Sequence, residues 1–171
     1  MRRALAAMVL VLLAGCGGDD PPAGIAVRDL TVESKAVGRD MAVKVVVPEG
    51  GGAKRPLLVF LHGRANDESS YVHAPMLAAL KALGRDAPIV AFPDGAEDKY
   101  WHDRASGDWG RYVVREVIPQ VARRFGADRR RVAIGGISMR RWPGGHDGDC
   151  WDAHWRDYLR FYARGLSAAS A

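Results

Sequence analysis

Ser138 is the residue whose setting in the sequence best suits covalent chemistry. It follows a short apolar run, residues 132–134, and the glycine pair Gly135-Gly136, with one isoleucine between that pair and the serine. The run predicts a buried strand, and the glycines allow a sharp turn after it without a side-chain clash. A serine hydroxyl is a poor nucleophile at neutral pH, so it needs such exposure and a neighbouring base. Residues 136–140, Gly-Ile-Ser-Met-Arg, follow the G-x-S-x-G elbow pattern with arginine in place of the last glycine.

Two further loops are expected near this serine because a buried strand precedes each of them. Residues 57–61, Leu-Leu-Val-Phe-Leu, have no polar face, which is typical of a strand covered on both sides in a parallel sheet. His62-Gly63-Arg64 follows that strand, and Pro93-Asp94-Gly95 follows a second apolar strand at residues 88–92. In α/β sheets, ligands bind beyond the carboxyl ends of the strands. We therefore expect these two loops and Ser138 to lie along one edge of the sheet.

The whole chain alternates strands with helices, and this order predicts an α/β fold. The mostly parallel sheet would have about five strands flanked by helices. Gly38-Arg39-Asp40 would form the turn between the first two strands, and residues 96–108 would form a surface excursion. The expected strands are residues 25–33, 41–47, 57–61, 88–92 and 131–136, and the expected helices are residues 71–83, 108–125 and 151–162.

The helix expected at residues 108–125 carries its own start and stop signals. Asp108 is placed to cap its amino end, and Gly126 is placed to end it. Pro119 lies inside this helix and would kink it, because proline lacks the backbone N–H that the helix needs. Gly84 gives a similar stop after the earlier helix.

Composition and charge describe one ordinary domain rather than a nucleic-acid-binding protein. The chain has 171 residues, of which 48% are hydrophobic and 26% charged, with a formal net charge of +5. This length and composition suit a single domain with a substantial core. The arginines at positions 123, 124 and 129–131 read as a solvated helix end and loop. Since no aromatic residues are interleaved with them, we expect no nucleic-acid partner.

No metal or cofactor is expected from the sequence. His102-Asp103 and His146-Asp147 are isolated pairs without the ligand spacing of a zinc site. No glycine-rich phosphate loop follows the first strand, so a nucleotide is not expected either.

The first residues are typical of an export signal and not of the fold. Arg2 and Arg3 precede an apolar run at residues 4–14, which is too short to span a membrane. Residues 13–16, Leu-Ala-Gly-Cys, resemble the bacterial lipobox, which implies cleavage before Cys16 and a lipid on its sulfur. The alternative is an ordinary signal with a chance cysteine. We expect residues 1–15 to be the signal, 16–24 a flexible tether and 25–171 the domain, held as an exported lipoprotein on the periplasmic or cell-surface side of a membrane. With Cys16 lipidated, Cys150 would be an unpaired thiol.

The motifs together resemble the esterase branch of the α/β-hydrolase fold, the group that includes esterase D, feruloyl-esterase-like and mycolyltransferase-like proteins. The likeness rests on Leu57–Gly63, Phe92–Gly95, Trp101-His102, the helix from Asp108, and residues 134–139. It covers roughly residues 30–139, with a further patch near the C-terminus.

The resemblance implies a role for each site residue. Ser138 would be the nucleophile, and the backbone N–H groups of Met139 and of Gly63 or Arg64 would form the oxyanion hole. His62 would shape its loop rather than act as a base. Residues 142–147, Trp-Pro-Gly-Gly-His-Asp, look like the family's terminal histidine loop, with His146 as the base. The substrate would be a small-molecule or polysaccharide-linked ester, and no cofactor is implied.

The sequence departs from the family pattern directly after the elbow. Only seven residues separate Ser138 from His146, and none of them is Asp or Glu. The acid of the triad is therefore unknown, and Asp147, Asp149 and Asp103 are the candidates. The resemblance thus implies a truncated α/β-hydrolase-type domain that is incomplete after residue 139. Residues 132–134 would then expose apolar area at an unpaired edge of the sheet.

Three functions remain open from the sequence. The first is a serine ester hydrolase that forms an acyl-enzyme at Ser138. The second is a degenerate, non-catalytic fragment of such an enzyme. The third is a surface binding lipoprotein that presents Tyr100, Trp101 and Trp109 to a carbohydrate, against the simpler interpretation that these aromatic side chains only pack.

Overall fold

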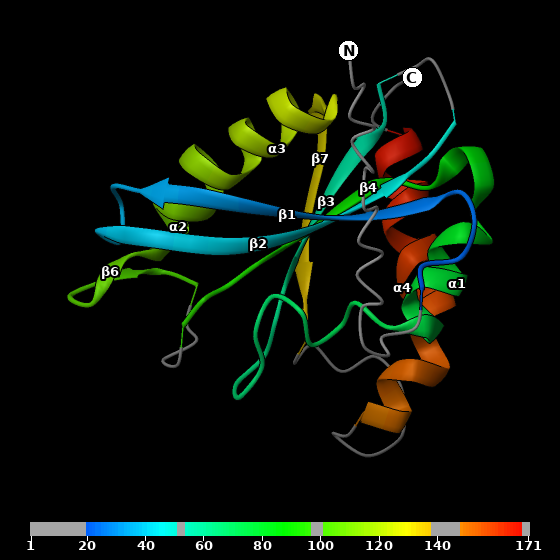
Figure 1. Cartoon of the computed structure of the whole chain (residues 1–171), viewed down its shortest axis with the longest axis horizontal. Helices are drawn as coiled ribbons and strands as arrows, with labels where there is room; N and C mark the ends of the chain where they lie inside the picture. The colour runs from blue at the N-terminus through cyan, green and yellow to red at the C-terminus, as the bar shows by residue number, and fades with distance from the viewer. Residues whose placement is uncertain (1–19, 51–53, 97–100, 138–147, 169–171) are drawn as a thin grey trace, which may run out of the picture.

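The computed structural model describes residues 20–50, 54–96, 101–137 and 148–168, and its centre is a five-stranded sheet (Figure 1). The strand order across the sheet is β1-β2-β4-β3-β7. The five strands are β1 (Ile25–Ser34), β2 (Arg39–Pro48), β3 (Pro56–Leu61), β4 (Ile89–Pro93) and β7 (Asp128–Gly136). The helices are α1 (Ala74–Lys81), α2 (Trp109–Arg111), α3 (Ile118–Phe125) and α4 (Gly148–Ala168).

The sheet is mostly parallel in strand direction, as the sequence predicts. β3 pairs in parallel with both β4 and β7, whereas β2 is antiparallel to β1 on one side and to β4 on the other. Four of the five strands therefore run the same way, and β2 alone runs against them. The turn between β1 and β2 comprises residues 35–38 rather than the expected 38–40, since Arg39 already pairs with Ser34.

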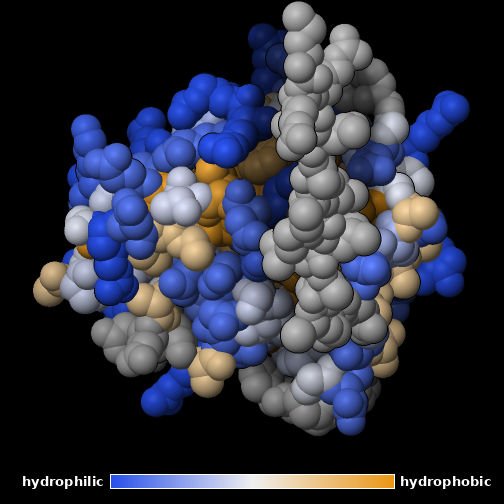
Figure 2. All heavy atoms as spheres, in the orientation of Figure 1, coloured by the Kyte–Doolittle hydropathy of each residue, from blue (hydrophilic) through white to orange (hydrophobic). Residues whose placement is uncertain are grey.

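Helices cover both faces of the sheet and divide the core into two clusters. α2 and α3 lie on one face and α1 and α4 on the other (Figure 1). Alternate residues of β3 face the two sides, with Leu57 and Val59 in the first cluster and Leu58 and Phe60 in the second. This double burial is what the continuous apolar run of β3 predicts. On the side of the molecule seen in Figure 2, where β1 and β2 lie toward the viewer, many of the exposed side chains are hydrophilic.

The helix expected at residues 108–125 forms as three consecutive pieces. A π-helical segment, Tyr112–Val117, joins α2 to α3, and Pro119 lies in the first turn of α3. Pro119 therefore lies where a missing backbone N–H is tolerated, directly after the wider turns of the π-helical segment. Gly126 ends the helix in the left-handed conformation at φ 73°, as predicted.

Two details of the sequence prediction are wrong in this region. Asp108 does occupy the capping position, but its carboxylate makes no capping hydrogen bond and instead pairs with Arg111, 2.9 Å away. The excursion at residues 96–108 also contains a short hairpin that the sequence did not predict, formed by β5 (Asp103–Arg104) and β6 (Gly107–Asp108). A strand of two residues is too short to show an alternating pattern.

β7 lies at the end of the sheet, and part of it is exposed, as the sequence predicts. The Ile134 side chain is 48% exposed, and Val132 is half-buried. α4 packs on the face of β7 opposite to the Ile134 side chain, and there Tyr162 lies against the backbone of Gly135. None of the helices in the described ranges is long and apolar enough to cross a membrane.

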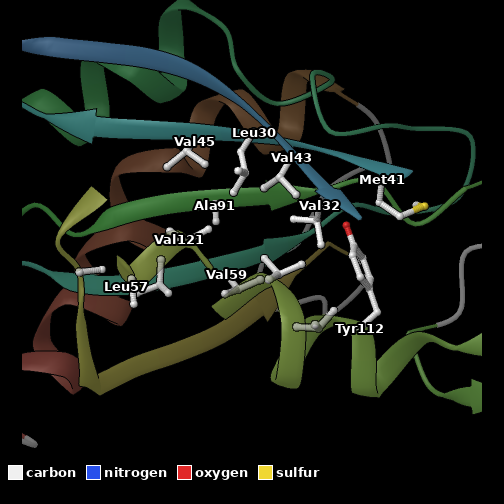
Figure 3. Packing of buried hydrophobic residues seen from close by; sticks show 14 of the residues in the cluster. Leu30, Val32, Met41, Val43, Val45, Leu57, Val59, Ala91, Tyr112 and Val121 are labelled. Atoms are coloured by element: carbon white, nitrogen blue, oxygen red, sulfur yellow. The ribbon is translucent and has the colours of Figure 1, made fainter. Parts of the chain in front are cut away.

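The buried hydroxyl of Tyr112, in the first core cluster, is expected to lower the stability of the fold. The Tyr112 side chain is fully buried, its hydroxyl lies beside Val32 and Met41 (Figure 3), and no described residue bonds with that hydroxyl. Burial also raises the pKa of Tyr112 well above its usual value. A buried hydroxyl without a partner costs about 1–3 kcal/mol. We therefore expect Tyr112→Phe to raise the free energy of unfolding by about 1 kcal/mol in urea titrations. A loss of stability would mean that the hydroxyl has a partner.

Candidate active site

A cavity of about 530 Å³ lies beyond the carboxyl ends of β3 and β7. Its walls come from the loop after β3, from the last residue described after β7, and from the amino end of α4. The residues that matter for chemistry are Gly63, Arg64, Tyr71, His73, Ile137 and Asp152. This is the edge of the sheet at which the sequence predicts the site.

The structure brings part of the predicted site together. Gly63 and Arg64 line the cavity, and Ile137, which immediately precedes Ser138, lines it too. The N–H of Ile137 donates to the Leu61 carbonyl at 3.2 Å, so the end of β7 is held against β3 up to that point. Ser138, Met139, His146, Asp147 and Cys16 lie outside the described residues.

Two of the candidate acids are described, and the cavity is lined by a different carboxylate. Asp103 lies in β5, where its Oδ1 accepts the backbone N–H of Arg111 at 3.0 Å. Asp149 lies in the first turn of α4 and is exposed. The carboxylate that lines the cavity is that of Asp152, one turn further along α4.

His62 joins the loops that follow β3 and β4. Its ring is 3% exposed and uses both nitrogens, because Nδ1 lies 2.9 Å from the Gly63 carbonyl and Nε2 accepts the Gly95 N–H at 2.8 Å. The indole N–H of Trp101 donates to the His62 carbonyl at 3.1 Å. These bonds fix a neutral ring protonated on Nδ1 and leave no nitrogen for acid–base work. His62 therefore shapes the loops rather than serving as a base.

His62 also sets the surroundings of Asp94. The carboxylate lies 3.7 Å from His62 Nε2 and accepts the Ala96 N–H at 2.9 Å. This Ala96 N–H lowers the pKa of Asp94 by stabilising its charged form. We assign the stronger hydrogen bond of Nε2 to Gly95, because 3.7 Å is too long for a bond to the carboxylate.

Both loops contain an alanine in the left-handed region of backbone conformation. Ala65 has φ 66° and Ala96 has φ 54°. Such a conformation costs about 1–3 kcal/mol for a residue other than glycine and is found preferentially where surrounding contacts hold a functional loop. The bonds through His62, and the bond from Ala96 to Asp94, are contacts of this kind.

Tyr71 supports the loop that would supply the oxyanion donors. It is buried, which raises the pKa of its hydroxyl, and the nearby backbone N–H of Gly63 partly offsets this rise. The hydroxyl therefore stays protonated at neutral pH. The backbone N–H groups of Gly63 and Arg64 both remain candidates for this half of the oxyanion hole.

The two glycines before the serine are needed for close packing. Neither has a positive φ, unlike Gly126. A Cβ on Gly136 would lie 2.6 Å from the Leu61 carbonyl oxygen, and one on Gly135 would collide with the Tyr162 hydroxyl. The Gly-Gly pair thus lets β3 and α4 approach the end of β7, which is a different reason from the sharp turn that the sequence suggested.

A histidine–carboxylate pair that the sequence analysis did not predict lies on the cavity wall. His73 Nε2 is 3.3 Å from Asp152 Oδ1, and the indole N–H of Trp155 donates to the same oxygen at 3.3 Å. His73 immediately precedes α1, whereas the other two residues lie in α4, so the pair links the two helices. Its residues are far apart in the sequence and no motif joins them, so only the fold reveals the pair.

The aromatic residues of the excursion pack inside the protein. Trp109 is 2% exposed and belongs to the first core cluster. Trp101 is half-buried between His62 and Gly95, where a Cβ would lie 2.7 Å from its ring. Tyr100 lies outside the described residues. Packing is therefore the role of the two tryptophans. In the described ranges, no three His, Cys, Asp or Glu side chains lie together in a way that could hold a metal ion.

Comparison with solved structures agrees on the fold. A ferulic acid esterase has a TM-score of 0.60 and 21% identity, with 67% of this chain and 51% of the other covered. An S-formylglutathione hydrolase from Staphylococcus aureus has a TM-score of 0.54 and 22% identity, with 67% and 48% covered. A fluorophosphonate-binding serine hydrolase of the same organism has a TM-score of 0.55 and 20% identity, with 66% and 47% covered. The chain thus spans about half the length of these structures, and its fold is of the α/β-hydrolase type.

Comparison at the level of sequence gives the family. No protein with a curated description matches the chain. A family profile described as Putative esterase matches residues 34–146, which include β2, β3, β4, β7 and the Ser138 elbow. Since this match covers more than half of the 171 residues, the chain belongs to this esterase family.

Proposed function

We propose that this chain is a serine ester hydrolase that forms an acyl-enzyme at Ser138. The observation that carries the proposal is the cavity that joins the loop after β3 to the end of β7, one residue before that serine. The family match and the likeness to esterase structures support the same reaction class.

In the proposed reaction, the Ser138 hydroxyl attacks the ester carbonyl while a histidine takes its proton. The carbonyl oxygen of the ester becomes an oxyanion that the N–H groups of Met139 and of Gly63 or Arg64 stabilise, each donor being worth about 3–4 kcal/mol of barrier. The histidine then protonates the leaving alcohol, and water releases the acyl group by the same steps in reverse.

The base and its acid are proposed as two alternatives. The first is His146, as the histidine loop implies, with an acid still to be identified. The second is His73 with Asp152, because this pair lines the cavity and Asp152 is fixed by Trp155. An acid must hold the far nitrogen of the imidazole, and the second pair already has this contact.

The substrate is proposed to be a small-molecule or polysaccharide-linked ester with a modest acyl group. A volume of about 530 Å³ is within the range of small-molecule sites. The ferulic acid esterase among the similar structures makes an aromatic acyl ester a reasonable first substrate.

We further propose that the protein is exported and anchored through a lipid on Cys16.

Labelling with a fluorophosphonate tests this function. We expect the purified protein to be labelled at the peptide that contains Ser138, and Ser138→Ala to abolish the label in mass spectrometry. A lost base lowers the labelling rate by about 10²–10⁴-fold, so His146→Ala and His73→Ala should separate the two alternatives.

A matched control keeps the result interpretable. His154→Ala removes a partly exposed histidine of α4 that does not line the cavity, and it should label at the normal rate. If the folded protein is not labelled at all, the chain is a non-catalytic member of its family and the proposal is overturned.

A further inference from the structure

A groove of about 690 Å³ runs between β7 and the carboxyl-terminal half of α4. Val132 and Ala133 contribute to it from the strand, and Phe161 and Leu166 contribute from the helix. The candidate active site lies at the other end of the same strand, beyond Gly136. The groove is therefore a separate site and takes no part in the proposed hydrolysis.

The outer edge of β7 gives the groove backbone groups that can bond with a strand. The inner edge pairs with β3 from Leu57↔Val132 to Leu61↔Gly136, and no strand among the described residues pairs with the outer edge. Residues 132–137 carry no charge, and Ile134 is 48% exposed. An exposed edge with these properties is a template for another extended segment.

The charges around the groove define which segment would fit. Arg130, Arg160 and Arg164 line it and are exposed, and Asp157 is the one carboxylate among the described lining residues. Arg131 is already engaged, since its side chain lies 2.9 Å from Asp128 and also bonds with the Lys54 carbonyl. The groove thus presents an excess of positive charge beside apolar surface.

We propose that this groove binds an extended acidic segment of a partner protein, which adds to β7 as a sixth strand. Its backbone would bond with the outer edge of β7, and its alternate apolar side chains would pack against Ile134, on the face of the sheet away from α4. Its carboxylates would pair with Arg130, Arg160 and Arg164. This is the β-augmentation mode of peptide recognition, with charge setting the preference.

A second copy of this chain fits less well than an acidic partner. Pairing two β7 edges would bring two sets of Arg130, Arg160 and Arg164 toward one interface, and like charges across paired strands are destabilising. An anion without a polypeptide backbone could pair with the arginines but would leave the strand edge without hydrogen bonds.

Fluorescence anisotropy with designed peptides tests the proposal. The probe is a fluorescein-labelled peptide of alternating Glu and Val, as long as the nine residues of β7. We expect saturable binding to the whole protein at low salt. Arg160→Glu with Arg164→Glu should weaken it by at least about tenfold, since both contacts become repulsive. Arg123→Glu with Arg124→Glu, on the exposed end of α3, should leave it unchanged.

Two altered peptides separate strand addition from simple attraction between charges. Prolines at the fourth and fifth positions replace one valine and one glutamate and remove one backbone donor from each edge of the peptide, so binding should be lost. A peptide with alanine at the same two positions lacks the same side chains and the same charge but keeps its backbone donors, and it should still bind. Lysine in place of glutamate should also abolish binding. The proposal is overturned if the proline peptide binds as tightly as the original peptide. It is also overturned if Arg160→Glu with Arg164→Glu, and Arg130→Glu, each bind the original peptide as tightly as the unaltered protein does. A dimer in light scattering that fails to bind the acidic peptide assigns the groove to a second copy instead.

Discussion

Replacing Trp155 by alanine is expected to lower the free energy of unfolding by about 3–5 kcal/mol, the usual cost of removing a buried tryptophan. Trp155 is 2% exposed, and its ring packs against Phe60 at 5.1 Å and Tyr71 at 5.9 Å between ring centroids. Its indole N–H also donates to Asp152. One side chain thus connects α4 to β3 and to the wall of the cavity, so its loss opens a void that the neighbouring rings cannot fill.

Phe161 provides the matched control for this variant. It is an aromatic residue of the same helix, but it is 57% exposed, so Phe161→Ala should change the free energy of unfolding by no more than about 0.5 kcal/mol. Denaturation in guanidinium chloride, followed by far-UV circular dichroism, measures both variants. A loss below about 1 kcal/mol for Trp155→Ala would show that α4 does not contribute to the folded core.

The parts of the fold that the sequence predicts well are those with a local signal. The uninterrupted apolar run of β3 indicates a strand buried on both faces, and every residue from Pro56 to Phe60 is buried. Gly126 indicates a helix end, and it lies there in the left-handed conformation. Both signals depend on a few neighbouring residues and on general physical rules. Contacts with residues far away in the chain therefore do not change either prediction.

The parts that the sequence does not predict depend on partners that lie far away in the chain. Glu116, in the π-helical segment, accepts the N–H groups of Lys35 and Ala36 at 3.1 Å and a hydrogen bond from the buried Ser34. Nothing near Glu116 indicates that it would hold the turn between β1 and β2. The pair formed by His73 and Asp152 is of the same kind, because each residue alone is an ordinary helix-end side chain.

The candidate site is intermediate between these two cases. The placement of Gly63 and Arg64 beside the end of β7 follows from strand order, since adjacent parallel strands end at the same edge. The need for glycine at positions 135 and 136 does not follow from the strand order. A side chain is excluded there because Tyr162 and the Leu61 carbonyl approach the backbone closely. A glycine indicates that space or conformation is restricted, and only the packed structure shows which.

Replacing His62 by alanine should destabilise the protein by about 2–4 kcal/mol, because it leaves the Gly95 N–H without its buried acceptor and removes a packed ring. The Gly63 carbonyl would lose its bond with the ring as well, and Trp101 would lose its edge-on contact with the imidazole, whose centroid lies 5.1 Å away. The two loops that His62 joins would then relax away from the conformations that hold Ala65 and Ala96 at positive φ.

The same variant distinguishes a loop-shaping histidine from a catalytic one. Urea unfolding should show the loss of stability, and fluorophosphonate labelling of Ser138 should slow as the backbone donors of the loop after β3 lose their position. His62→Gln offers a control, since an amide oxygen can accept the Gly95 N–H and should restore part of the stability. A base would behave in the opposite way, because its removal would leave stability intact while abolishing reactivity, and glutamine would restore nothing. Since both ring nitrogens are already bound within the loops, we expect stability and reactivity to fall together and to recover together.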